Sequence, residues 1–295
     1  MNEDMNIPAK CMQTDLQCID KSKNSTVPGG VYLCQVSDSV SCGACCGLYN
    51  LEKLSRRELA AELEKRTYQF AGMSRKVSEI IYFGEKVAAR VHKNQPFPKF
   101  HHCPYVGLIG NEPSRIGCLL HPMAEGNNGI DFRGLSYYGG MACRIYFCPV
   151  NKCLPERFKL ITRACFDDWY AYGLIITEND LISGIFKEIE TRLGFHVYLD
   201  SISDEALSKI YRLLTLKLEW PFRSPQWPIV NYFFEDRKYC SPDIVYHAIH
   251  VKPSRYHGIL QALGSTFSCA DNLHQAESIL DEHFDVVIEK VLPPC

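Results

Sequence analysis

The chain has 295 residues, of which 46% are hydrophobic and 22% are charged, a balance typical of a water-soluble globular protein. Its formal net charge of −2 and isoelectric point near 6.5 argue against a strongly basic surface, so we expect no nucleic-acid partner. The length suffices for roughly two domains of about 100–200 residues each.

The beginning of the chain, residues 1–23, is polar and lacks the apolar stretch of about 7–15 residues that a signal peptide requires. No segment approaches the roughly 20 consecutive apolar residues of a membrane span. We therefore expect a cytoplasmic protein without a membrane span. In that reducing compartment, the 15 cysteines favour metal binding or redox chemistry over a disulfide framework.

Three parts are expected along the chain. Residues 1–30 are predicted to form a flexible tail, which ends in the turn-forming sequence Val-Pro-Gly-Gly. Residues 31–155 are predicted to form a loop-rich, cysteine-cluster metal-binding domain, and residues 156–295 a helical domain. The fold class expected from these parts is α+β and predominantly helical.

Two helices are predicted in the first half of the chain. A Ser-x-x-Glu capping box at Ser55 and Glu58 predicts a helix that continues to about Phe70. Apolar residues at helical spacing predict a second helix over residues 74–92, which the prolines that follow would stop.

Residues 101–155 are rich in glycine, proline and asparagine and show little periodicity. A stretch of this length without regular structure is uncommon in a compact domain unless something else organises it. A bound metal would do so, because ligation replaces part of the missing apolar core. The composition of this region therefore favours a metal centre.

The second half of the chain is predicted to be mainly helical. The predicted helices span residues 156–172, 179–193, 204–220, 242–250, 253–263 and 271–291. A weak alternation of apolar and polar residues predicts a short strand over residues 195–199. Cys165 lies on the first of these helices beside aromatic residues and is interpreted as a core thiol.

The candidate metal ligands are seven closely spaced cysteines: Cys42, Cys45, Cys46, Cys103, Cys118, Cys143 and Cys148. Thiolates are preferred ligands of zinc and of iron–sulfur clusters. Because one tetrahedral zinc takes only about four ligands, iron fits the surplus slightly better than zinc, and one cluster plus one other ion is also open. Side chains of adjacent residues point apart, so Cys45 and Cys46 either bind different metals or one of them only packs.

Four further residues remain open as ligands: Cys153, His101, His102 and His121. Arg144 either offsets the charge of the thiolates or makes a surface salt bridge. The Gly/Tyr-rich segment 134–140 either covers the cysteines or packs as a turn, and we favour the turn.

The order of the motifs Cys42-x2-Cys45-Cys46, Cys103-Pro-Tyr, Gly-Cys118 and Cys143-Arg, with Cys148, resembles the CxxCxxCC-type cysteine-cluster family. The resemblance covers about residues 34–153 and implies chelation of zinc or iron by these cysteines. Flagellin lysine N-methylase carries a similar cluster, so the resemblance also allows an enzyme. The chain differs from the family between residues 122 and 143, where many members have a short Arg-Pro connection.

We therefore expect a metal-binding protein that holds an iron–sulfur cluster or zinc. One alternative is a metal-cluster-dependent enzyme, either a protein methylase-like transferase or an oxidoreductase. The other is a zinc-stabilised protein that binds an unidentified protein partner. The short motifs of nucleotide-binding loops and serine hydrolases are absent from the sequence, so neither activity has support from a motif.

Overall fold

The computed structural model describes residue 24 and residues 27–52, 54–91, 95–97, 100–110, 114–225, 227, 229 and 243–291. Most of the predicted tail over residues 1–30 therefore lies outside the described residues. The described elements are mainly helices, and the sheet among them has two short strands, which agrees with the predominantly helical class.

Helices α3 (Arg56–Ala71) and α4 (Val77–Val91) confirm the two helices predicted in the first half. The Ser55 hydroxyl caps α3 by accepting a hydrogen bond from the backbone N–H of Glu58 at 3.3 Å. The two helices pack through Phe70 and Phe83, whose rings meet edge to face with centroids 5.4 Å apart.

A hairpin that the sequence did not predict lies in the glycine-rich region. Strands β1 (Val106–Ile109) and β2 (Arg115–Cys118) pair antiparallel, with Val106 opposite Cys118. Thr67 on α3 fixes the hairpin, because its hydroxyl bonds the backbone N–H and carbonyl of Leu108. Apart from this hairpin, the described part of residues 101–155 forms only short helical pieces, η4 (Arg133–Leu135), α5 (Gly139–Ile145) and α6 (Val150–Cys153).

The predicted helix over residues 156–172 is wrong as a single element. The structure divides it into α7 (Glu156–Ala164) and α8 (Trp169–Ile175). Asp168 causes the new start, because its carboxylate accepts hydrogen bonds from the backbone N–H groups of Tyr170 at 2.6 Å and Ala171 at 3.2 Å.

The remaining helices follow the prediction more closely. They are α9 (Asn179–Leu193), α10 (Asp204–Glu219), α11 (His257–Ala262) and α12 (Ala270–Ile288). The helix predicted over residues 242–250 is a short 3₁₀ turn, η6 (Tyr246–Ile249), and residue 242 lies outside the described residues.

The strand predicted over residues 195–199 is also wrong. The described chain there makes no strand and enters the 3₁₀ turn η5 (Leu199–Ser201). The N–H of Val197 bonds the Glu190 carboxylate at 3.2 Å instead of a strand partner. Gly194, in the left-handed conformation with φ of 78°, redirects the chain directly after α9.

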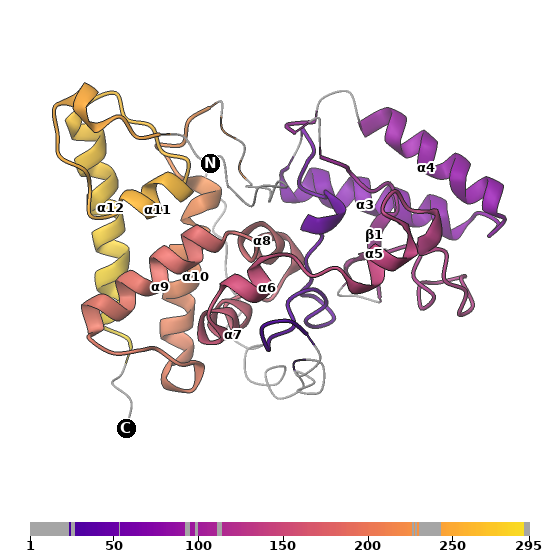
Figure 1. The fold of residues 1–295 in the computed structure, drawn as a ribbon, viewed down its shortest axis with the longest axis horizontal. Helices are drawn as coiled ribbons and strands as arrows, with labels where there is room; N and C mark the ends of the chain where they lie inside the picture. Colours follow the sequence, from indigo (N-terminus) through magenta and orange to yellow (C-terminus); the bar gives the residue numbers. More distant parts are fainter. Residues whose placement is uncertain are drawn as a thin grey trace.

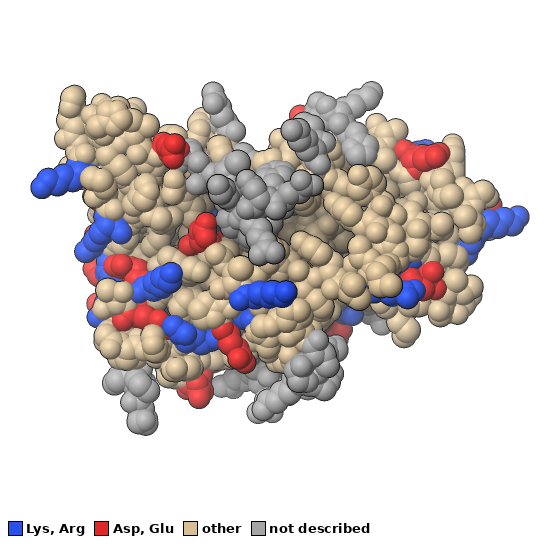
Figure 2. All heavy atoms as spheres, viewed as in Figure 1, with Lys and Arg blue, Asp and Glu red and all other residues tan. Residues whose placement is uncertain are grey.

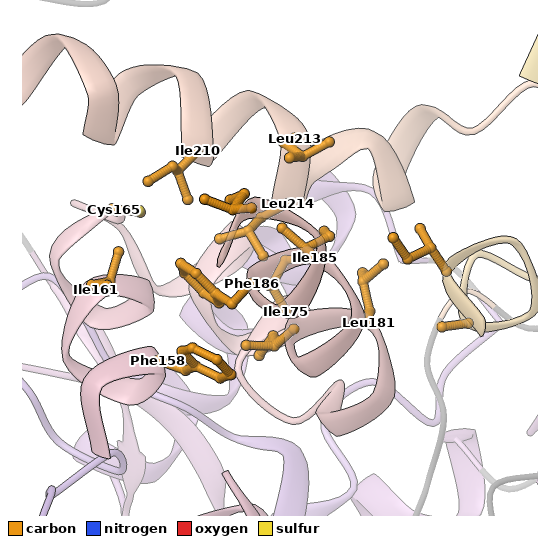
Figure 3. Close-up of a cluster of buried hydrophobic side chains, with 14 of the residues drawn as sticks. Phe158, Ile161, Cys165, Ile175, Leu181, Ile185, Phe186, Ile210, Leu213 and Leu214 are labelled. Atoms are coloured by element: carbon orange, nitrogen blue, oxygen red, sulfur yellow. The ribbon is translucent and has the colours of Figure 1, made fainter. Parts of the chain in front are cut away.

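Helices α9 to α12 lie at one end of the molecule, and α3, α4, β1 and α5 at the other, with α6 to α8 between them (Figure 1). The large apolar core occupies the helical end, where Phe158, Ile185 and Leu214 face one another (Figure 3). Val31, Leu33 and Val40 belong to the same core, so this one core contains residues from both sides of the predicted domain boundary at residue 155.

Two smaller apolar clusters contact the cysteine-bearing part of the chain. The first joins Leu48 and Tyr49 to α3, the hairpin and Trp169. The second joins α3 and α4 to Leu119 and Leu120 after the hairpin. This part is therefore built on smaller cores than the helical end is.

On the face drawn in Figure 2, charged side chains of both signs are interspersed, mainly over the half that contains α9 and α10. Within the described residues, the structure has no helix that combines the length and the apolar character needed to cross a membrane.

Candidate metal centre

The sequence Cys-Gly-Ala-Cys-Cys-Gly forms a tight turn whose helical part is η2 (Ala44–Cys46). Gly47 ends the turn in the left-handed conformation, with φ of 69°. A Cβ atom on Gly47 would lie 2.1 Å from the carbonyl oxygen of His101. Glycine is therefore what lets this turn pack against the backbone of the segment that carries Cys103.

Cys34 lies next to Cys42, although it is not among the seven ligands predicted from the sequence. The backbone N–H of Cys42 donates to the carbonyl of Cys34 at 2.9 Å, and an antiparallel bridge joins Gln35 to Ser41. The side chains of Gln35 and Ser41 bond the carbonyl and the N–H of Ile116, each at 2.8 Å. The loop that carries both thiols is thus fixed to β2.

Cys46, Cys103 and Cys118 form a second group of neighbouring cysteines. The N–H of Cys103 donates to the carbonyl of Cys46 at 2.8 Å. The hairpin brings Cys118 near Cys103, because the backbone N–H of Leu119 donates to the carbonyl of Tyr105 at 2.9 Å. All three thiols pack against the cluster formed by α3 and α4.

The last two predicted ligands follow the Gly/Tyr-rich segment. Cys143 is exposed on α5, with its sulfur 3.2 Å from the hydroxyl of Ser136. Cys148 packs against the large helical core, and the Asn151 amide donates to its sulfur at 3.4 Å.

Burial keeps most of these thiols protonated. It raises the pKa of Cys103 to about 12 and the pKa of Cys118 and Cys148 to about 11 each, and neighbouring thiols add to the effect. Cys45 is the exception, because a hydrogen bond from the Cys46 thiol lowers its pKa. A metal that binds here must therefore displace protons from most of its ligands.

Two arginines lie near the thiols of this region. The charge of Arg133 partly offsets the effect of burial on the pKa of Cys118, and buried Arg66 does the same for Cys103. Arg144 instead pairs with Asp131 at 2.6 Å while half exposed, as in the salt-bridge alternative.

The three histidines that remained open as ligands have different surroundings. His102 is buried, with Nε2 2.7 Å from the Arg66 guanidinium and Nδ1 2.8 Å from the carbonyl of Gly47. Because a guanidinium only donates, Nε2 accepts and Nδ1 carries the proton, which engages both ring nitrogens. His102 thus positions the turn in this arrangement.

The other two histidines have different contacts. The ring of His101 stacks on the ring of Tyr137, with centroids 4.1 Å apart. Nδ1 of His121 accepts a hydrogen bond from the backbone N–H of Met123 at 3.2 Å.

The Gly/Tyr-rich segment does form a turn, but that turn reaches the thiols. Burial raises the pKa of Tyr138, and the nearby Cys45 and Cys46 add to this shift. Several large apolar side chains beside it are exposed, among them Tyr137, Met141 and Ile145. The segment therefore borders the cysteines without a core of its own.

The remaining thiols differ from this group. Cys165 is buried in the helical core, as the sequence predicted (Figure 3). Cys153 ends α6 and is exposed. Within the described ranges, no three Cys, His, Asp or Glu side chains stand so that they could hold an ion in their present positions. The backbone gathers the cysteines, but their side chains do not converge on one point.

A cavity of about 560 Å³ lies apart from these cysteines. Its lining is Leu51, Glu52, Leu54, Ser55, Pro96, Tyr170, Pro225, Trp227 and Ile229. The lining is mainly apolar and contains no cysteine.

Comparisons with protein-family models, with curated proteins and with solved structures found no match for this chain. The resemblance to the cysteine-cluster family thus stays an expectation from the motifs. The candidate site is interpreted from its own residues.

Proposed function

We propose that the chain is a metal-binding protein, with residues 31–155 as the part that holds an iron–sulfur cluster or zinc. The main support is the way separate segments supply thiols to one region. The turn at residues 42–47, the hairpin and the segment around α5 each contribute cysteines, and backbone hydrogen bonds connect them. Thiols gathered in this way suit a thiophilic metal.

The competing explanation is that these cysteines are ordinary apolar core residues. Cys165 shows what such a residue is like, since it is buried among aliphatic and aromatic side chains of one large core. Cys45 and Cys143 differ from it, because both are exposed, and Cys143 contacts a hydroxyl. Packing alone gives no reason for exposed thiols beside other thiols, whereas ligation does.

Binding would require a local rearrangement, because the thiols do not converge in their present positions. An unfolded chain rarely contains a preformed metal site, so ligation commonly contributes part of the folding free energy. Rotation of cysteine side chains about a fixed backbone is a small change of this kind. We infer that metal binding orders side chains that the backbone has already brought near one another.

The test is purification without oxygen, followed by metal analysis, acid-labile sulfide analysis and visible absorption. We expect stoichiometric iron with sulfide and colour, or stoichiometric zinc without colour. Cys45→Ser should lower the metal content, whereas Cys269→Ser, at the exposed N-terminal end of α12, should leave it unchanged. A wild-type protein that contains neither metal and keeps its fold after chelator treatment would contradict the proposal.

A further inference from the structure

We propose that the chain has two separate four-cysteine metal centres, an inference that rests on the proposed metal binding. Centre A consists of Cys34, Cys42, Cys45 and Cys148. Centre B consists of Cys46, Cys103, Cys118 and Cys143. The proposal adds Cys34 to the seven ligands expected from the sequence and assigns each thiol to one centre.

The division begins at the adjacent residues Cys45 and Cys46. Both belong to the 3₁₀ turn η2, and such a turn has about three residues per turn, so successive side chains differ in direction by roughly 120°. Neighbouring thiols in such a turn stay close to each other, but their different directions allow them to serve two adjacent centres that meet at the turn.

The neighbours of Cys45 in centre A come from two other segments. Cys34 and Cys42 are joined by the 2.9 Å backbone hydrogen bond, and the bridge between Gln35 and Ser41 closes the loop between them. Cys148 packs against the same large core as Cys42. The N–H of Ala44 also points at the Cys42 sulfur, at 3.5 Å, as donors commonly do at thiolate ligands.

The neighbours of Cys46 in centre B come from the hairpin and α5. Cys103 is joined to Cys46 by the 2.8 Å backbone hydrogen bond, and the hairpin brings Cys118 to the same apolar cluster. Cys143, on α5, has its sulfur 3.2 Å from the hydroxyl of Ser136, and η4, which ends just before Ser136, packs through Leu135 against that same cluster.

The packing of the thiols follows the same division. Cys42 and Cys148 pack against the large helical core, whereas Cys46, Cys103 and Cys118 pack in the cluster formed by α3 and α4. Cys42 and Cys46 also share the cluster around Leu48, so the two groups meet at the turn that carries both residues.

Four thiolates per centre satisfy the coordination of a tetrahedral zinc and also of a four-iron cluster. The two centres would differ in charge compensation. Arg66 lies near centre B, because its guanidinium is 2.7 Å from Nε2 of His102, the residue before Cys103. Centre A lies against the large helical core through Cys42 and Cys148.

The partition is tested by counting metal centres per chain in cysteine variants. Native mass spectrometry of protein purified without oxygen, with iron, zinc and sulfide analysis, identifies the metal. Titration of metal-free, reduced protein with cobalt(II) then counts four-thiolate sites by their absorption. We expect two equivalents for the wild type, and one each for Cys34→Ser and Cys118→Ser, because one centre remains intact. Cys269→Ser is the control and should keep both.

Double variants distinguish the loss of one centre from a general disturbance of the fold, because both pairs contain two substitutions but differ in the number of centres that they affect. Cys34→Ser with Cys148→Ser removes two ligands of one centre and should still leave one equivalent. Cys34→Ser with Cys118→Ser affects both centres and should leave none. Circular dichroism of the helices checks that each variant is folded.

The outcomes separate failure of the partition from failure of metal binding itself. One equivalent in the wild type, lost completely in either single variant while the helices remain folded, would overturn the partition and leave the proposed function intact. Unchanged metal content in Cys34→Ser would also overturn it. No metal in any variant, including the wild type, would overturn both proposals.

Discussion

The helical end and the cysteine-bearing end of this molecule are held together in different ways. At the helical end, side chains from α7 to α12 share one large apolar core. At the cysteine-bearing end, single polar side chains hold loops in place. Asn50 bonds the backbone of Phe97 and Phe100 at three points, each at 2.9 Å, and Asn127 bonds the carbonyls of Leu119 and His121.

This difference shows what each end tolerates. The free energy of apolar burial is non-directional and roughly proportional to the buried area. Its loss therefore lowers stability more than it changes the positions of the remaining side chains. Hydrogen bonds to loop backbone are directional, and a buried group that loses its partner is costly. Substitutions at the helical end should therefore change stability alone, whereas those at the cysteine-bearing end should change metal binding as well.

The largest effect on stability is expected for Phe186→Ala. Phe186 is fully buried and stacks on Phe158 with ring centroids 4.8 Å apart. Loss of the ring should lower the free energy of unfolding by about 4 kcal/mol, measured by urea denaturation, and leave the metal content unchanged. Tyr82→Ala, at a largely exposed tyrosine on α4, is the control and should cost far less. Loss of metal from folded Phe186→Ala protein would break the contrast between the ends.

Gly47→Ala should have the next largest effect. The left-handed conformation costs alanine about 1–2 kcal/mol, and the Cβ atom would overlap the carbonyl of His101. We expect a total loss of about 3 kcal/mol in unfolding free energy, together with weaker metal binding. Gly129→Ala is a matched control, because Gly129 has a similar φ of 81° and open space around it. Equal losses in the two variants would show that the close approach at Gly47 contributes nothing.

His102→Ala should cost about 2 kcal/mol, because it leaves a buried Arg66 guanidinium and the Gly47 carbonyl without their imidazole partner. The turn that carries Cys46 should then be less well positioned, and metal affinity should fall roughly tenfold. His274→Ala, at an exposed histidine on α12, is the control. Metal affinity equal to that of the wild type would count against a positioning role.

Local signals in the sequence account for the elements that were predicted well. The capping box at Ser55 marks the start of α3, and the apolar face of α9 fits its observed span, Asn179–Leu193. The β1–β2 hairpin escaped prediction because Gly107 and Gly117 weaken the strand pattern, although both are needed where Thr67 and Ile109 approach closely.

The candidate site shows the same limit. Short spacings identified seven cysteines, but nothing local distinguished Cys34, whose place depends on a loop fixed to β2. The available signal was the spacing Cys34-x7-Cys42, which is longer than the x2 and x4 spacings among the predicted ligands. The role of His102 likewise depends on Arg66, 36 residues away.

The smallest effect is expected for Glu190→Gln at the helical end. Arg157 donates two hydrogen bonds to the Glu190 carboxylate, at 2.7 and 2.9 Å. Burial raises the pKa of Glu190, but hydrogen bonds from Arg157, His196 and Val197 outweigh it, and the pKa lies below its usual value of 4.5. We expect the substitution to cost about 1 kcal/mol at neutral pH.

The pH dependence of this variant tests the cause of its effect. A carboxylate whose pKa is lowered by folding stabilises the protein above the unfolded-state value, and this contribution is lost as the pH falls through the folded-state pKa. The difference in unfolding free energy between wild type and Glu190→Gln should therefore be constant near neutral pH and shrink as the pH falls below about 4.5. If this difference in unfolding free energy stayed constant at acidic pH, the stabilisation by Glu190 would depend on its shape and not on its charge. Metal content should not change at neutral pH, because Glu190 and its partners belong to the helical end.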